Sequence, residues 1–307
     1  MLKDIGGLAM KLKSMKSKTT KRFLVFLGIS ILTSCSTKKT ETDINSGQND
    51  SATHITQKPD LKGIPEVPAT ELDPSKMVEL SFDKAMILDD VPEDQILPPD
   101  KTIAGKSTAL IRKQVELQWP NIRLLDEKGK IKKFTVLMET DLGTVKIALR
   151  PELSPNHVRN FVALIQTGYY DGLRIDRIVH QQYQSMDGTT NRLDLLRAGC
   201  PIGIGDEGIG HLGYWLKPEF SKTEKNETGT VGFWHDASPT SACCRFYIAL
   251  DSAPLLDGEY TIIGKVVEGI DHLKEISKTR GMISKIESDQ EKPMNPVIIH
   301  RMVVQSP

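Results

Sequence analysis

Apolar and polar residues alternate along several short runs in the second half of the chain. This two-residue period is typical of β-strands that bury one face. The runs cover residues 134–139, 144–150, 173–179, 246–250, 260–267 and 297–304. Asp141-Leu142-Gly143 separates the first two runs and predicts a turn between them. The pattern therefore predicts a domain made largely of short strands.

Two helices are predicted among these strands. Ser154-Pro155 supplies an N-cap residue followed by a proline in the first turn, and apolar residues then recur at helical spacing. Gly168 follows this stretch, as glycine often does at the end of a helix. We expect this helix at about residues 155–167. Glu268-Gly269, after the run of residues 260–267, opens a second, short helix.

The N-terminal region has a different pattern, in which a basic segment precedes a short apolar run. Residues 11–22 are rich in Lys and Arg, and residues 23–32 are almost wholly apolar. That run is too short to span a bilayer, which takes about 20 residues, but it suits the core of a signal peptide. Leu32-Thr33-Ser34-Cys35 resembles a bacterial lipobox, whose cysteine is diacylated. We predict a lipoprotein signal peptide over residues 1–34 and lipidation of Cys35; an uncleaved anchor or a chance cysteine is the alternative.

The segment that follows divides into two parts. Residues 35–70 are polar and poor in aromatic residues, which predicts a disordered tether. Repeated prolines interrupt residues 71–130, and we expect an extension of unknown role that packs partly against the β domain. With Cys35 acylated, the tether would hold a periplasmic domain at a membrane. Ser36 resembles the outer-membrane sorting pattern of many Gram-negative lipoproteins.

Composition narrows the function classes. Lys+Arg and Asp+Glu both number 40, so the formal net charge is +0 and gives no reason to expect a nucleic-acid partner. The cysteines do not stand at a standard metal-binding spacing with His211 or His235. We therefore expect neither a metal nor a cofactor.

Short motifs in the strand-rich region follow the order found in one known family. The motifs are Asn160–Leu164, Gly168–Gly172, Ile175–Val179, Arg245–Ile248, Leu256–Gly258 and Ile263–Gly269. Over roughly residues 131–305, the chain resembles a cyclophilin-type peptidyl-prolyl cis-trans isomerase. The resemblance implies a closed eight-stranded antiparallel β-barrel capped by two α-helices, in a domain of residues 131–307.

The reaction that the resemblance implies is rotation about an X–Pro amide, against a barrier of about 18–20 kcal/mol. Rotation breaks the amide resonance, so the twisted state is less polar and its nitrogen is more basic. An apolar pocket favours that state, and a fixed donor stabilises the nitrogen lone pair as it forms. Arg177, in the Ile175–Val179 motif, is expected to be the donor, since its guanidinium is rigid and always charged. A surface arginine on an edge strand is the alternative.

The resemblance also implies a pocket for the proline ring. Its expected substrate-binding residues are Leu195, Arg197, Phe233, Trp234, Arg245, Tyr247, Leu255 and Tyr260. Trp234 stands where the family carries a small alanine, and Leu255 stands where many members carry Trp or Phe. For Phe233 and Trp234, packing in the core is the alternative to lining the pocket.

Two departures from the family pattern change the charge of this pocket. Arg197 and Arg245 stand where the family carries glutamines. If they converge with Arg177, an anion is needed to offset the like charges, which favours acidic peptides or a terminal carboxylate as substrates. Alternatively, Arg245 pairs with Asp236 or Glu259 inside the fold.

Two questions stay open at this level. The resemblance brings the loops of Cys200 and Cys243-Cys244 together, so a disulfide from Cys200 to one of the pair is expected outside the cytoplasm.

The function is either a lipid-anchored prolyl isomerase for exported proteins or a module that binds proline segments without isomerising them. The presence of Arg177 favours the isomerase, and the altered pocket favours the binding module.

Overall fold

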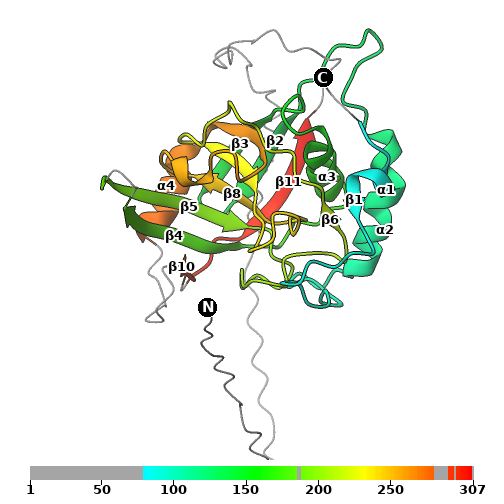
Figure 1. The fold of residues 1–307 in the computed structure, drawn as a ribbon. Helices are drawn as coiled ribbons and strands as arrows, with labels where there is room; N and C mark the ends of the chain where they lie inside the picture. The colour runs from blue at the N-terminus through cyan, green and yellow to red at the C-terminus, as the bar shows by residue number, and fades with distance from the viewer. Residues whose placement is uncertain (1–78, 185–187, 280–289, 294, 306–307) are drawn as a thin grey trace, which may run out of the picture. The chain divides into compact units, whose positions relative to one another are not determined.

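The computed structural model describes residues 79–184, 188–279, 290–293 and 295–305 (Figure 1). The predicted signal peptide, Cys35 and the tether of residues 35–70 lie outside this part of the chain. Among the helices of the described residues, none combines the length and the apolar character needed to cross a bilayer.

A nine-stranded antiparallel sheet forms the main body of the described residues. In order of pairing its strands are β10 (Gln290–Glu291), β4 (Ile175–Gln184), β5 (Thr190–Ala198), β8 (Phe246–Ala249), β7 (Thr230–Phe233), β9 (Ile262–Glu268), β3 (Gly143–Leu149), β2 (Thr135–Thr140) and β11 (Ile299–Gln305). Two short strands, β1 (Met86–Ile87) and β6 (Trp215–Leu216), pair apart from this sheet. The mainly β, antiparallel prediction is confirmed.

Closure of the sheet is less complete than the predicted barrel. The continuous strand ladder runs from β10 to β11, and these two end strands are not paired with each other. The segment before β4 joins the segment before β11 through one bridge, between Arg174 and Ile298. Three hydrogen bonds extend it. The Gly172 N–H donates to the Ile299 carbonyl, the Ile299 N–H donates back to the Leu173 carbonyl, and the Ile175 N–H donates to the Val297 carbonyl. The expectation of a closed barrel was therefore an overstatement.

Two helices form where the sequence predicted them, α3 (Pro155–Gln166) and α4 (Ile270–Thr279) (Figure 1). Ser154 is the N-cap residue of α3, but its hydroxyl donates to the Ile262 carbonyl at 2.6 Å instead of capping the helix. The Glu219 carboxylate accepts the first free N–H groups of α3, from Asn156 and His157. A distant acid thus satisfies the helix end.

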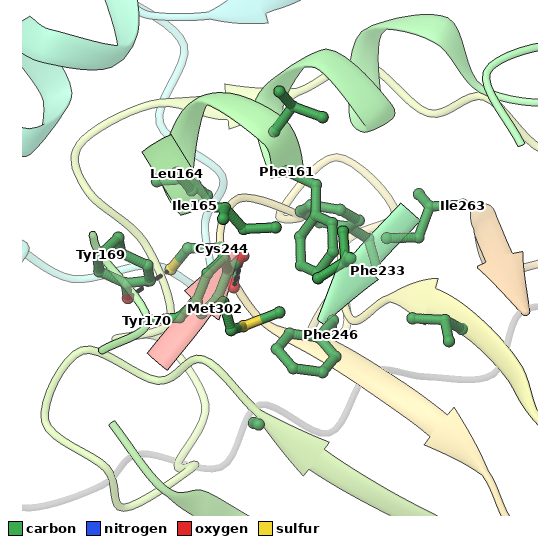
Figure 2. Packing of buried hydrophobic residues seen from close by; sticks show 14 of the residues in the cluster. Phe161, Leu164, Ile165, Tyr169, Tyr170, Phe233, Cys244, Phe246, Ile263 and Met302 are labelled. Carbon is green, nitrogen blue, oxygen red and sulfur yellow. Dashed lines mark hydrogen bonds between the residues drawn. The ribbon is translucent and has the colours of Figure 1, made fainter. Parts of the chain in front are cut away.

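The main hydrophobic core lies between α3 and the sheet. Figure 2 shows Phe161 of α3 above Phe233 and Phe246, which come from neighbouring strands β7 and β8. The ring centre of Phe161 lies 5.4 Å from that of Phe246 and 6.0 Å from that of Phe233, in edge-to-face geometry. Burying each ring stabilises the fold by about 1.5–3 kcal/mol.

The N-terminal extension packs on the outer side of α3. It contains α1 (Phe82–Ala85), α2 (Thr108–Gln118) and a 3-10 turn η2 (Trp119–Asn121). The Arg159 guanidinium of α3 lies 4.4 Å over the Trp119 ring. It also donates to the carbonyls of Leu80 and Trp119, at 2.6 and 2.7 Å. These charge-assisted bonds fix the extension to the helix.

Candidate functional site

Strands β4 and β5 form a hairpin that places Arg177 on the same face as two apolar residues, Val179 and Leu195. Arg177 lies opposite Arg197, and two residues further on Val179 lies opposite Leu195. Because side chains alternate between faces, these four share one side of the sheet. The hairpin therefore sets two arginines at the edge of an apolar surface.

That surface is a second apolar cluster, separate from the main core, which we call the pocket cluster. Its buried members are Val179, Leu193, Leu195, Tyr247, Ala253 and Leu256, and the partly exposed Tyr183, Trp234 and Tyr260 pack against it. Tyr247 is fully buried at its centre and donates its hydroxyl to Asn226 Oδ1 at 2.5 Å. Burial raises the pKa of Tyr247 well above its usual value, so the phenol stays protonated.

Two aromatic side chains cover Tyr247. The Trp234 ring centre lies 6.5 Å from that of Tyr247 and 5.0 Å from that of Tyr260, which itself stacks on His235 at 4.1 Å. The Arg197 guanidinium lies over the Trp234 ring, 4.0 Å from its centre. Trp234 thus occupies space above the apolar floor, at the position where the family carries alanine.

Two predicted pocket residues lie elsewhere. Phe233 packs in the main core, where its ring faces Phe161, because it points to the opposite side of β7 from Gly232. The Leu255 side chain is 51% exposed, and its neighbour Leu256 belongs to the pocket cluster instead. Leu255 and Leu256 lie on the 3-10 turn η3 (Pro254–Leu256), and the strand pattern could not predict which of their side chains points into the cluster.

Sequence reasoning missed several members of the pocket cluster. Val179 could have been found by continuing the alternation two residues beyond Arg177. Leu193 and Tyr183 lie on the long β4–β5 hairpin and carry no family motif. Ala253 packs into the cluster from the loop after β8, and only the tertiary structure brings it there.

The Arg177 guanidinium is held against a loop and does not extend into solvent. Its Nη2 donates to the carboxylate of Asp206, and only 10% of the Arg177 side chain is exposed. Lys292, in the segment after β10, places Nζ 2.8 Å from the same carboxylate oxygen. Arg177 therefore stands beside the pocket cluster in a fixed ionic contact.

Arg197 and Arg245 are buried, each with 1% of the residue exposed. Arg197 donates to the Gly205 carbonyl at 3.0 Å. Burial, and after it the charge of Arg245, lowers the pKa of Arg197 to about 10, which leaves it protonated at neutral pH. Arg245 donates to the Asp236 carboxylate and, at 3.2 Å, to the Asp206 carbonyl.

The interior pairing of Arg245 with Asp236 is thereby confirmed. Burial by itself would lower the pKa of Arg245, but the adjacent Asp236 carboxylate outweighs it and raises that pKa. Three arginines do converge, and the chain supplies its own anions from Asp206 and Asp236. The expected preference for acidic peptides loses its basis, because Arg197 and Arg245 are too deeply buried to meet a substrate.

The N-terminal extension braces this ionic cluster. Gln95 donates its side-chain amide to Asp236 Oδ2 at 2.9 Å, and the Ile96 N–H donates to the Gly208 carbonyl at 2.9 Å. The Ile96 carbonyl in turn lies 2.6 Å from His211 Nε2. Residues 95–96 therefore tie the loops of Gly208 and Asp236 together behind the arginines.

The expected disulfide is absent. Cys200, Cys243 and Cys244 are free and buried. Cys244 Sγ accepts from the Tyr169 hydroxyl at 3.2 Å and donates to the Gly210 carbonyl at 3.1 Å, so this thiol is held by hydrogen bonds. No group of three metal-ligating side chains occurs within the described residues.

Comparisons with known proteins identify the family of this domain. Residues 135–304 match the family model described as cyclophilin type peptidyl-prolyl cis-trans isomerase/CLD. The chain is 34% identical over 145 residues to a probable peptidyl-prolyl cis-trans isomerase of Brucella suis, which covers 47% of this chain and 71% of that protein. It is 28% identical to peptidyl-prolyl cis-trans isomerase-like 3 of Gallus gallus, over 56% of this chain and 96% of that protein.

A crystal structure of a cyclophilin-type isomerase of Cryptosporidium parvum is also similar, with a TM-score of 0.46 and 24% identity over 57% of this chain and 99% of that one. A second crystal structure of that isomerase, determined in the presence of the dipeptide Ala-Pro, has a TM-score of 0.43. The family model matches more than half of the chain and includes every strand from β2 to β10. The chain therefore belongs to the family of cyclophilin-type peptidyl-prolyl cis-trans isomerases, and this membership supports peptidyl-prolyl isomerase activity.

Proposed function

We propose that this domain isomerises X–Pro bonds in exported polypeptides, with Arg177 as the donor to the twisted amide. One observation carries the proposal: the Arg177 guanidinium is fixed on the same face of the β4–β5 hairpin as Val179 and Leu195 of the pocket cluster. An apolar surface for the proline ring and a cation beside it are the two devices that the reaction needs.

The chemistry involves no covalent step. As the amide twists, conjugation is lost, the C–N bond lengthens and the proline nitrogen gains a localised lone pair. Arg177 donates a hydrogen bond to that nitrogen, which is stronger in the twisted state than in the planar one and therefore lowers the barrier. Its second role is electrostatic, because a guanidinium in a water-poor site acts more strongly than it would in bulk water.

The setting proposed for this activity is the bacterial cell envelope. The apolar run at residues 23–32 and the lipobox ending in Cys35 support a lipid-anchored protein whose domain faces the periplasm. Fatty-acid labelling in a bacterial host tests the anchor. Label on the wild-type chain and none on Cys35→Ser is expected, and equal labelling of both chains would remove the lipid anchor from the proposal.

Substitution of Arg177 tests the catalytic role. Arg177→Ala should lower kcat/KM for a proline tetrapeptide by about 10²–10³, the loss typical of one transition-state donor. Arg192→Ala is the matched control, since Arg192 lies on the same hairpin with 62% of its side chain exposed. Wild-type activity in Arg177→Ala would refute the role of this arginine.

A second function, proline-peptide binding with little turnover, is favoured by one observation. Tyr247 is fully buried beneath Trp234 and Tyr260, so these two side chains cover the floor of the pocket. Isothermal titration with a proline peptide, run beside the kinetic assay, separates the two functions. Binding without catalysis above background in the wild-type chain would establish the binding module.

A further inference from the structure

The loop of residues 203–208 lies directly against the three arginines. Gly203, Gly205 and Gly208 all have positive φ, at 65°, 64° and 80°, so the loop adopts a path that other residues rarely follow. A Cβ at Gly205 would lie 2.6 Å from Arg177 Cγ. The loop therefore approaches Arg177 more closely than a side chain at position 205 would permit.

Each arginine finds a hydrogen-bond acceptor in this loop. The Asp206 carboxylate accepts from Arg177, the Gly205 carbonyl accepts from Arg197 at 3.0 Å, and the Asp206 carbonyl accepts from Arg245 at 3.2 Å. Among these acceptors, the Asp206 carboxylate alone carries a charge. Lys292 Nζ also lies 2.8 Å from the carboxylate oxygen of Asp206 that Arg177 contacts.

Arginine side chains carry donors only, so Arg197 and Arg245 cannot orient Arg177 by accepting from it. The family pattern has glutamines at those two positions, and glutamine can accept. With both glutamines replaced, an acceptor for Arg177 must come from another element. The partly exposed carboxylate of Asp206 meets this need, and a charge-assisted bond to a guanidinium is short and directional.

We propose that Asp206 is a positioning residue that orients Arg177 for the reaction. This inference rests on the proposed role of Arg177 as the donor to the proline nitrogen. A free arginine side chain samples many rotamers, and fixing it before the substrate arrives removes that entropy from the barrier. Lys292 and the carbonyl contacts hold the loop, so Asp206 is itself fixed in place.

The test compares Asp206→Asn and Asp206→Glu with the matched control Glu207→Gln, an exposed acid one residue further along the loop. Exchange spectroscopy by NMR on a proline peptide, with the full chain, gives the interconversion rate of the bound peptide separately from its Kd. We expect Asp206→Asn to lower the bound rate by up to about 100-fold, the effect of a small misplacement, while Kd stays within about threefold. Asp206→Glu should recover part of the rate, and Glu207→Gln should match the wild-type chain.

A double variant shows whether Asp206 acts through Arg177. On an Arg177→Ala background, adding Asp206→Asn should cause no further loss of rate, whereas independent effects would multiply. An unchanged or faster bound rate in Asp206→Asn would overturn the proposal, and so would a loss in which Kd rises in step. If Arg177→Ala keeps the wild-type rate, the proposed catalytic role of Arg177 is refuted. If Arg177→Ala is slow but Asp206→Asn keeps the wild-type rate, only the positioning role of Asp206 is refuted.

Discussion

The buried pair of Asp236 and Arg245 offers a direct test of how the ionic cluster stabilises the fold. Asp236→Asn keeps the shape of the side chain, and its amide oxygen can still accept from Gln95 and from the Gly208 N–H. The substitution removes the negative charge that faces Arg245, whose side chain is 1% exposed. Because arginine does not give up its proton in proteins, the guanidinium stays charged after it has lost its hydrogen-bonded partner, and Asp176, which acts on Arg245 more weakly than Asp236 does, is the acid that remains beside it.

The expected loss is large. Breaking a buried ion pair from one side destabilises a protein by about 3–5 kcal/mol, because an uncompensated charge remains in the interior. The total free energy of unfolding of a domain is about 5–15 kcal/mol, so the variant loses a major share of it. At about 2–4 °C per kcal/mol for a domain of this size, Tm should fall by about 6–20 °C.

Urea titration and thermal melting of the full chain at pH 7 measure this loss. Glu207→Gln is the control, since it removes one acid from an exposed position and should stay within about 0.5 kcal/mol of the wild-type chain. Asp236→Asn combined with Arg245→Met removes both charges, and most of the lost stability should return. A loss below about 1 kcal/mol in the single variant, or a double variant no more stable than it, would refute the reasoning.

Three further predictions concern other parts of the domain. Burial by itself would raise the pKa of Glu219, but the hydrogen bonds from His157 outweigh burial and lower that pKa. The ionised Glu219 carboxylate should therefore stabilise the fold at neutral pH, and this stabilisation should be lost as pH falls below about 4.5. Glu219→Gln should flatten the dependence of Tm on pH in that range. Phe161→Ala should cost about 3–5 kcal/mol by urea titration, because it leaves a cavity between α3 and the sheet. Trp234→Ala should uncover Tyr247 and tighten the binding of proline peptides by isothermal titration; weaker binding would show that the indole itself contacts the peptide.

Much of the fold follows from local patterns. The strands around β2, β3, β8 and β9 and the helices α3 and α4 lie where alternation, capping residues and glycines predicted them. These signals work at short range, since each depends on neighbours within a few residues. The closed barrel that the family resemblance implied was an overstatement. The extent of closure depends on pairing between residues 172–175 and 297–299, which is a long-range property that local patterns do not fix.

In the candidate site too, local motifs predicted some residues, and others depended on tertiary packing. Arg177 and Tyr247 were located from motifs, whereas Leu256 was missed in favour of Leu255, one residue away on a 3-10 turn. The direction of a side chain on such a turn depends on how the turn packs. Local sequence therefore identified the strands that carry the site more reliably than the individual side chains of its loops.

By itself, the sequence determined the family, the antiparallel strands and the arginine that stands at the pocket, because each depends on residues adjacent in the chain. Only the tertiary structure decided which anions neutralise the arginines. Asp206 lies 29 residues from Arg177, and Asp236 lies 9 residues from Arg245 across a loop. No spacing rule links such residues, since the energy of burying a charge depends on where the folded loops bring a counter-charge.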